Sequence, residues 1–182
     1  MARPELHYPA LRRLVVGLGV LCACAFDCHA DSRDRGEPQI KAGFLYNFMK
    51  HTEWPETARE RILCVGARAL PDDSLAGIDR LPLHDGRLAV RVVQSPEETH
   101  TCHALLLGRQ QRANLNGWLN AVAMRPVLTI GDLAGIDRPS TMINLFTEGR
   151  RVRYDLNLAP ARQAGLKFNP RLINLADTVY EE

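Results

Sequence analysis

Apolar side chains recur at helical spacing between residues 40 and 55. They lie three or four residues apart, and polar residues fill the positions between them. Pro38 suits the first turn of a helix, whereas Pro55 cannot continue one. Trp54 precedes a proline, so we expect it to be extended and its ring to pack elsewhere. The pattern predicts an amphipathic first helix with an apolar side of Ile40, Phe44, Leu45, Phe48, Met49 and Thr52, and a polar side of Lys41, Asn47, Lys50 and His51.

Apolar runs and helical patterns then alternate along the chain. Four continuous apolar runs predict buried strands, at residues 61–66, 87–93, 102–107 and 126–132. Two segments between them predict helices, at residues 71–76 and 112–124. Apolar strands that are separated by helices favour a mainly parallel sheet with helices on both faces.

The last forty residues break this alternation. Strand-like runs at 142–147 and 151–156 are joined by a short segment around Gly149, which predicts an antiparallel hairpin. Two helices are expected after it, one over Leu158–Gln163 and a last one from Pro170 with an apolar side of Leu172, Ile173, Leu175, Ala176 and Val179. The expected fold class is α/β: a mainly parallel sheet covered by helices on both faces, ending in an antiparallel hairpin and two C-terminal helices.

The first thirty residues have the pattern of a secretory signal peptide. Two arginines precede an apolar stretch at 14–21 that is too short to span a bilayer, and small residues follow it. Cleavage is expected after Ala30, with Ala25 as a competing site, although residues 21–24 also resemble a lipoprotein box. The expected organisation is a signal peptide at 1–30, a flexible polar leader at 31–37 and a single domain at 38–182.

Cleavage after Ala30 leaves two of the five cysteines, Cys64 and Cys102, in the mature chain. A pair of cysteines in an exported protein favours a disulfide. Such a bond closes a loop of about 39 residues and contributes roughly 4 kcal/mol on the chain-entropy account. The alternative is a metal site formed by both cysteines with His100 and His103, although this spacing fits no common zinc pattern.

Two function classes find no support in the sequence. The formal net charge of +2 gives no electrostatic footprint for nucleic acid. The chain has no nucleophile elbow, phosphate loop or dinucleotide motif. Its paired acids are neighbours in sequence and therefore do not converge as an acid–base pair: Asp72 with Asp73, Glu97 with Glu98, and Glu181 with Glu182. We therefore expect a protein that is not an enzyme and needs no cofactor.

An ordered set of segments resembles the YfiR-like family. The first is K-A-x-F-L-Y-N-F-x-x-x-x-E-W-P from Lys41 to Pro55, and the others are Val127–Asp132, Met142–Asn144, Arg151–Leu158 and residues 161–176. The stretch from Asp137 to Ser140 departs from the family, where a glycine pair is expected before the hairpin. Family members often carry cysteines at places corresponding to Cys64 and Cys102, and some hold a second pair that this chain lacks.

The resemblance implies a periplasmic regulatory protein. It implies binding and inhibition of the periplasmic sensor domain of an inner-membrane diguanylate cyclase, which lowers cyclic di-GMP and biofilm formation. An outer-membrane OmpA-like lipoprotein that sequesters the repressor, and a homodimer, are further expected associations, whereas nucleic acid is not. The alternative is a periplasmic small-ligand-binding module, with a metabolite at the C-terminal ends of the parallel strands.

The predicted partner-binding residues lie on the hairpin. An aromatic side chain beside arginines is a usual composition for an interface. The expected surface therefore contains Phe146, Arg151, Arg153 and Asp155, with Arg162 and Phe168 as further candidates. In the alternative interpretation, Phe146 belongs to the core and the arginines are simply solvated.

Overall fold

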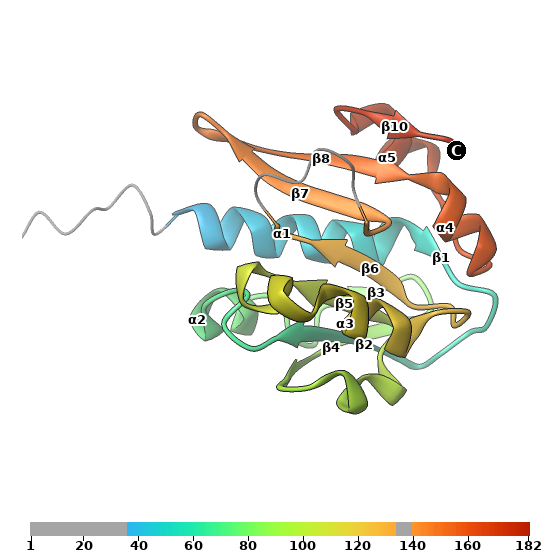
Figure 1. Ribbon diagram of the computed structural model, residues 1–182, viewed down its shortest axis with the longest axis horizontal. Coiled ribbons are helices and arrows are strands. Elements are labelled where there is room, and N and C mark those ends of the chain that lie inside the picture. The colour runs from blue at the N-terminus through green and yellow to red at the C-terminus, as the bar shows by residue number, and fades with distance from the viewer. Residues whose placement is uncertain (1–35, 134–139) are drawn as a thin grey trace, which may run out of the picture. The chain divides into compact units, whose positions relative to one another are not determined.

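The computed structural model describes residues 36–133 and 140–182 (Figure 1). The predicted signal peptide, its cleavage sites and its three cysteines lie outside these residues, as does the family departure at residues 137–139. Among the residues that are described, no helix has both the length and the apolarity needed to cross a membrane.

The predicted first helix is present as α1 (Gly36–His51). It begins two residues before Pro38, so Glu37 belongs to the helix and not to the leader. Leu45, Phe48 and Met49 are buried, as predicted. The helix is rotated relative to the prediction at its start, because Ile40 is 50% exposed and Lys41 is buried.

The helix also ends one residue earlier than predicted. Thr52 begins β1 (Thr52–Glu53), and its hydroxyl donates a hydrogen bond to the Phe48 carbonyl at 2.8 Å. Trp54 follows β1 and does pack, since the Arg61 guanidinium lies 4.5 Å from the centre of its ring. The Trp54 indole N–H donates to the His103 carbonyl at 3.2 Å.

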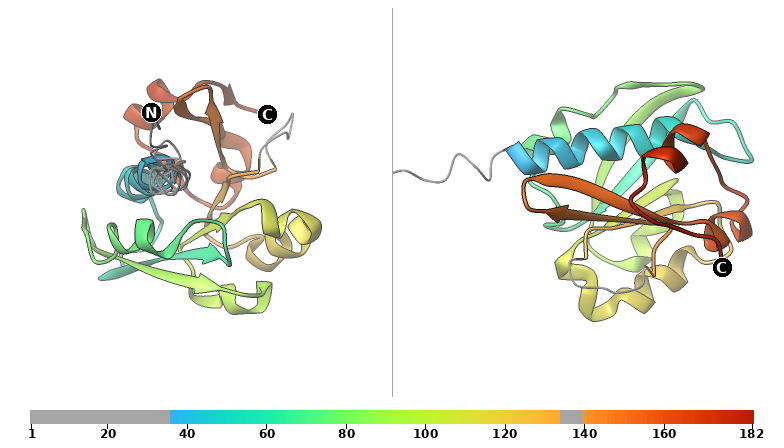
Figure 2. Two further views of the ribbon diagram at one scale, coloured as in Figure 1. Left: turned by 90° about the vertical axis from the view of Figure 1, so that its left-hand side faces the viewer. Right: turned by 90° about the horizontal axis from the view of Figure 1, so that it is seen from above.

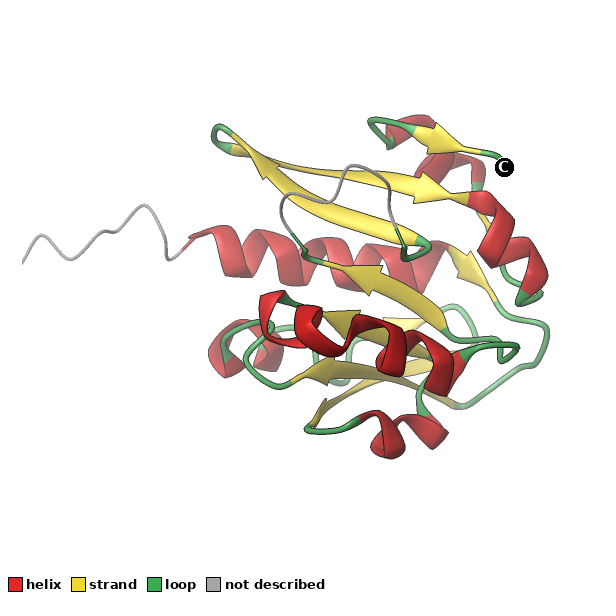
Figure 3. Ribbon diagram, in the orientation of Figure 1, coloured by secondary structure: helices red, strands yellow, loops and turns green. Residues whose placement is uncertain are grey.

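Eight strands form one sheet in the order β10-β8-β7-β6-β5-β2-β4-β3 (Figure 3). The strands from β4 to β7 in this order run parallel, and β8 returns antiparallel to β7, which confirms the predicted sheet and hairpin. The strand bounds are β2 (Glu60–Gly66), β3 (Pro82–Leu83), β4 (Gly86–Val93), β5 (Ala104–Leu107), β6 (Leu128–Gly131), β7 (Ile143–Glu148), β8 (Arg151–Asn157) and β10 (Val179–Tyr180).

Helices cover both faces of this sheet. On one face, α1 and α2 (Asp72–Ala76) enclose the larger apolar cluster with Leu63 and Val65 of β2. On the other face, Cys64 and Leu105 pack under α3 (Leu115–Val122) in a second cluster. Two 3-10 helices, η1 (Pro96–Thr101) and η2 (Arg109–Asn114), follow β4 and β5. The predicted helix at 112–124 is therefore 3-10 in its first turn, continues as α3 and ends at Val122.

The C-terminal region contains one confirmed helix and one corrected helix. The helix α4 (Leu158–Gln163) has the predicted bounds, and Gly165 follows it with a positive φ of 74°. The last helix, α5 (Pro170–Leu175), is shorter than predicted because the chain becomes extended at Ala176. Val179 therefore lies in β10, where it pairs with Leu156, and not on the apolar side of a helix.

A second, two-stranded sheet was not predicted. It pairs β1 with β9 (Lys167–Phe168) in antiparallel fashion, with Thr52 opposite Phe168. Strands of two residues are too short to show any periodicity in the sequence. This small sheet joins the end of α1 to the connection between α4 and α5.

Candidate partner-binding surface

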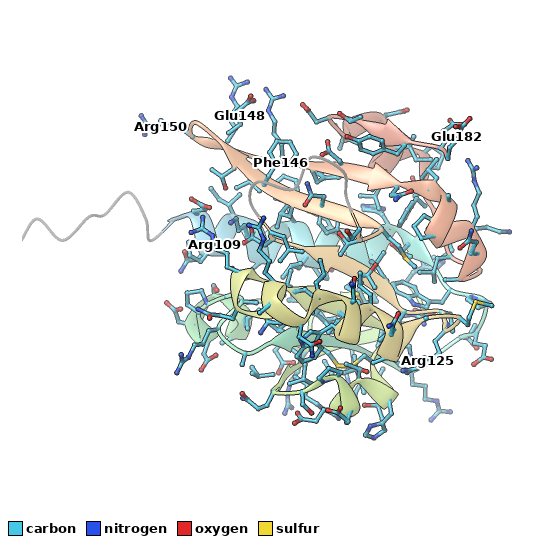
Figure 4. The ribbon with its side chains drawn as sticks, in the orientation of Figure 1. Arg109, Arg125, Phe146, Glu148, Arg150 and Glu182 are labelled. Atoms are coloured by element: carbon cyan, nitrogen blue, oxygen red, sulfur yellow. A yellow bond between two sulfur atoms is a disulfide. The ribbon has the colours of Figure 1, made fainter. Side chains whose placement is uncertain are left out.

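The hairpin brings the predicted interface residues onto one face. Phe146 of β7 lies directly opposite Arg153 of β8, and side chains at opposed positions share a face of the sheet. Phe146 is half-buried and belongs to neither of the apolar clusters that the described residues form. Figure 4 labels Phe146, Glu148 and Arg150 along this hairpin. We call this the hairpin outer face, and its residues are Phe146, Arg151, Arg153 and Asp155.

Arg153 is fixed in place on the hairpin outer face. Its Nε lies 3.2 Å from Oε2 of Glu148, and its Nη1 binds the carboxylate of Asp177. The hydrogen bond to Asp177 and the charges of both acids raise the pKa of Arg153. Since the guanidinium is already paired, it contributes an oriented planar group beside Phe146 and not a free charge.

The remaining candidates of this surface differ in their surroundings. Asp155 has a buried Oδ1 that no described residue binds. Arg162 is exposed on α4, where its Nη1 donates to the Glu181 carbonyl at 3.4 Å. Phe168 of β9 is half-buried and packs against the larger apolar cluster, so part of its side chain contributes to packing.

A groove beside the edge of β8 was missed by the sequence patterns. It has a volume of about 660 Å³ and lies between α1, β8 and α5. Phe48, Tyr154 and Leu172 are buried and form its floor, whereas Ile40 and Leu175 are 50% and 75% exposed at its borders. Both exposed residues had been predicted to face the core, and only the tertiary arrangement shows that they border a groove.

Tyr154 fixes the floor of this groove. Its ring centre lies 5.8 Å from that of Phe44 and 4.9 Å from that of Phe48, in edge-on arrangements. Its hydroxyl donates a hydrogen bond to the Leu172 carbonyl at 2.7 Å, which ties β8 to α5. Burial raises the pKa of Tyr154 to about 12, so the hydroxyl remains a hydrogen-bond donor at neutral pH.

The rim of the groove is positively charged. Arg150, Arg151 and Arg171 line it together with His51. Burial, followed by the charges of Lys50 and Arg171, lowers the pKa of His51. Since the imidazole is neutral at neutral pH, the net positive charge of the rim comes from its arginines, with Asp177 as an acid that is paired with Arg153.

The predicted disulfide is present. Cys64 and Cys102 are bonded, with their Cα atoms 5.7 Å apart. Their sulfurs are therefore not free as metal ligands, and His103 is also engaged because its Nδ1 accepts the Ile62 N–H at 3.0 Å. Among the described residues, no three side chains are arranged to hold a metal ion.

Part of the crevice that was considered for a metabolite is filled by the protein itself. At the C-terminal ends of β2 and β5, the buried Gln111 side chain accepts the Gly108 N–H at 3.0 Å and donates to the Ala67 carbonyl at 3.1 Å. A side chain added at Gly66 would meet Gln111 within 2.6 Å. This amide closes the part of the crevice over these two strands.

Comparison with known proteins identifies the family and supports the fold. A solved structure titled as a conserved domain protein from Vibrio cholerae O1 biovar eltor str. N16961 matches with a TM-score of 0.52 and 8% identity. The match covers 78% of this chain and 60% of that chain, and at this identity it shows a shared fold. The family model described as YfiR/HmsC-like matches residues 38–177, nearly the whole predicted domain. The chain therefore belongs to the YfiR/HmsC-like family, a family of periplasmic regulators in diguanylate cyclase signalling.

Proposed function

We propose that this protein is the inhibitory partner of an inner-membrane diguanylate cyclase. It binds the periplasmic sensor domain of the cyclase and holds the cytoplasmic catalytic domain inactive, which lowers cyclic di-GMP and biofilm formation. The observation that carries the proposal is the family match over residues 38–177. Export with cleavage after Ala30 would deliver a single domain of residues 38–182, with a short leader, to the compartment of the sensor domain.

The proposed function requires a binding equilibrium and no chemical step. A repressor acts when it binds the inhibited conformation of its partner more tightly than the active one. An OmpA-like outer-membrane lipoprotein that captures the free repressor would shift this equilibrium towards active cyclase by mass action. The activity of the cyclase then depends on which of the two partners the protein is bound to.

We further propose that the hairpin outer face contacts the sensor domain. Phe146 is an aromatic group outside both apolar clusters, and Arg153 is held beside it by Glu148 and Asp177. Aromatic and arginine side chains that are already oriented lose little entropy on binding and are enriched among interface hot spots. In the alternative, Phe146 belongs to the core and the arginines are simply solvated.

The proposal is tested with purified components. The mature chain, residues 31–182, is titrated by calorimetry into the isolated periplasmic sensor domain of the cyclase from the same organism. We expect a saturable complex with a Kd of about 1 μM or tighter, equivalent to roughly −8 kcal/mol. The cytoplasmic cyclase domain alone serves as the control and should give no heat of binding. A folded mature chain that does not bind the sensor domain would contradict the proposal.

A further inference from the structure

The edge of β8 nearest the hairpin turn lacks a partner strand among the described residues. On this side, β10 pairs only with the last two residues of β8. The Leu156 N–H donates to the Thr178 carbonyl, and the Tyr154 carbonyl accepts from the Asp177 N–H, so alternate residues of β8 direct their backbone groups to this side. Val152 lies two residues before Tyr154, so its backbone groups point to the same side of β8. Its N–H and carbonyl, and the N–H of Tyr154, therefore face outward without a partner in the described chain.

The groove runs along this open edge. The consecutive residues Arg150–Tyr154 all line it, as expected where a strand presents its edge and not one face. Figure 2, in its view from above, shows α1 alongside the hairpin and close to α5. Of the four large apolar side chains that are exposed in the described chain, two border the groove, Ile40 and Leu175. A strand placed at this edge would cover both.

The charges around the groove indicate which kind of segment would bind there. Among the described residues, none forms an ion pair with Arg150, Arg151 or Arg171, whereas the nearby acids Glu148 and Asp177 are already paired with Arg153. A second copy of the chain at this edge would bring these arginines against the same arginines, which is unfavourable. An acidic segment would instead neutralise them.

We propose that the β8 edge binds an extended acidic segment of a protein partner by strand addition. Main-chain hydrogen bonds to Val152 and Tyr154 hold the segment, and successive side chains of the segment point to opposite faces of the sheet. Its apolar side chains cover Ile40 and Leu175, and its carboxylates lie against Arg150, Arg151 and Arg171 of the rim. This inference rests on the geometry of the edge and not on the proposed cyclase partner.

The first test uses synthetic peptides and the mature chain. A fluorescein-labelled eight-residue peptide of alternating valine and glutamate is titrated by anisotropy, beside the valine–lysine peptide of the same length. The acidic peptide should bind, and the basic one should not. The double variant Arg151→Glu/Arg171→Glu should weaken binding about tenfold or more. The matched control is Arg87→Glu/Arg91→Glu, which makes the same charge change on exposed residues of β4 and should leave the affinity unchanged.

Amide hydrogen exchange measured by NMR tests the strand addition itself. In the free protein, the amides of Val152 and Tyr154 should exchange rapidly, and the acidic peptide should protect both. The Arg153 amide faces β7 and should be protected with or without peptide. Equal binding of both peptides, or of neither, would overturn the inference. So would protection of Val152 and Tyr154 in the free protein; if that protection grows with protein concentration, a second copy occupies the edge.

Discussion

The Lys41 ammonium lies 2.7 Å from Oδ2 of Asp132, across 91 positions of the chain. Lys41 also lies 2.9 Å from Glu37 in the preceding turn of α1. Burial opposes the charge on Lys41, but hydrogen bonds to Asp132 and Glu37 outweigh it and raise its pKa. The pair joins two of the segments that resemble the YfiR-like family, at the start of α1 and at the end of β6.

Loss of the Lys41 charge should destabilise the fold. Lys41→Met leaves the Asp132 carboxylate, which is 17% exposed, without its partner, and we expect a loss of about 3 kcal/mol in the free energy of unfolding. Urea denaturation measures this loss. Lys41→Met/Asp132→Leu should recover most of it, because no buried carboxylate is then left unpaired at position 132, and Glu37, the other partner of Lys41, is 34% exposed to water. The control Lys50→Met removes an exposed lysine of the same helix and should change stability by less than about 1 kcal/mol. A single variant as stable as the wild type would show that the pair contributes little.

Reduction of the disulfide should lower stability. The bond joins residues 38 positions apart within the second apolar cluster. We expect dithiothreitol, or Cys64→Ala/Cys102→Ala, to lower the free energy of unfolding by roughly 3 to 4 kcal/mol. The double variant should not respond to dithiothreitol. If non-reducing mass mapping finds both thiols free in protein isolated from the periplasm, the disulfide has no role in the native protein.

Acid should destabilise the protein through His103. Burial, and then the charge of Arg61, lower the pKa of His103 below its ordinary value of 6.5. The folded state therefore binds a proton less readily than the unfolded chain, so this contribution is complete above pH 6.5 and is lost as the pH falls through the folded pKa. Protonation would also break the hydrogen bond from the Ile62 N–H to Nδ1.

Asparagine at position 103 isolates this effect. In His103→Asn, the amide oxygen can accept the Ile62 N–H without titrating, so denaturation midpoints between pH 7 and pH 5 should fall less steeply than in the wild type. His84→Asn, on an exposed residue, should retain the wild-type slope. Identical slopes for the wild type and His103→Asn would exclude His103 as a source of acid sensitivity.

The hairpin outer face should contribute to partner binding but little to stability. Phe146→Ala/Arg153→Ala should weaken binding to the sensor domain by about 2 kcal/mol or more, roughly thirtyfold. The melting temperature should stay within about 3 °C, because exposed ion pairs contribute little. The matched control Met124→Ala/Arg87→Ala removes an exposed apolar side chain and an arginine whose ion pair, with Glu60, is also 3.2 Å long. Equal losses of affinity in both double variants would remove this face from the proposed interface.

The sequence predicts the parts of the fold that depend on local patterns. The apolar runs around Leu63 and Leu105 predict buried parallel strands, since such strands are covered on both faces. The alternation after Gly149 predicts that Val152, Tyr154 and Leu156 of β8 share one face and that Arg151, Arg153 and Asp155 share the other. The hairpin outer face follows from that alternation together with the turn, so its residues could be brought together before the structure was known.

Features that depend on distant residues could not be predicted in this way. Lys41 is buried because Asp132 meets it, and no pattern within α1 contains that partner. The exposure of Ile40 and Leu175 depends on how α1, β8 and α5 meet, so helical periodicity assigned both to the core. Val179 leaves the helical pattern because the edge of β8 offers it backbone partners.

Intracellular cyclic di-GMP is the quantity that tests the proposed function most directly. It should be measured in a strain that lacks this chain, in the same strain re-supplied with the full-length protein, and in one re-supplied with a version that lacks residues 1–30. The proposal predicts that cyclic di-GMP rises on deletion, returns with the full-length protein and stays high with the version that is not exported. Unchanged cyclic di-GMP on deletion, during growth and under envelope stress, would contradict a repressor of a diguanylate cyclase.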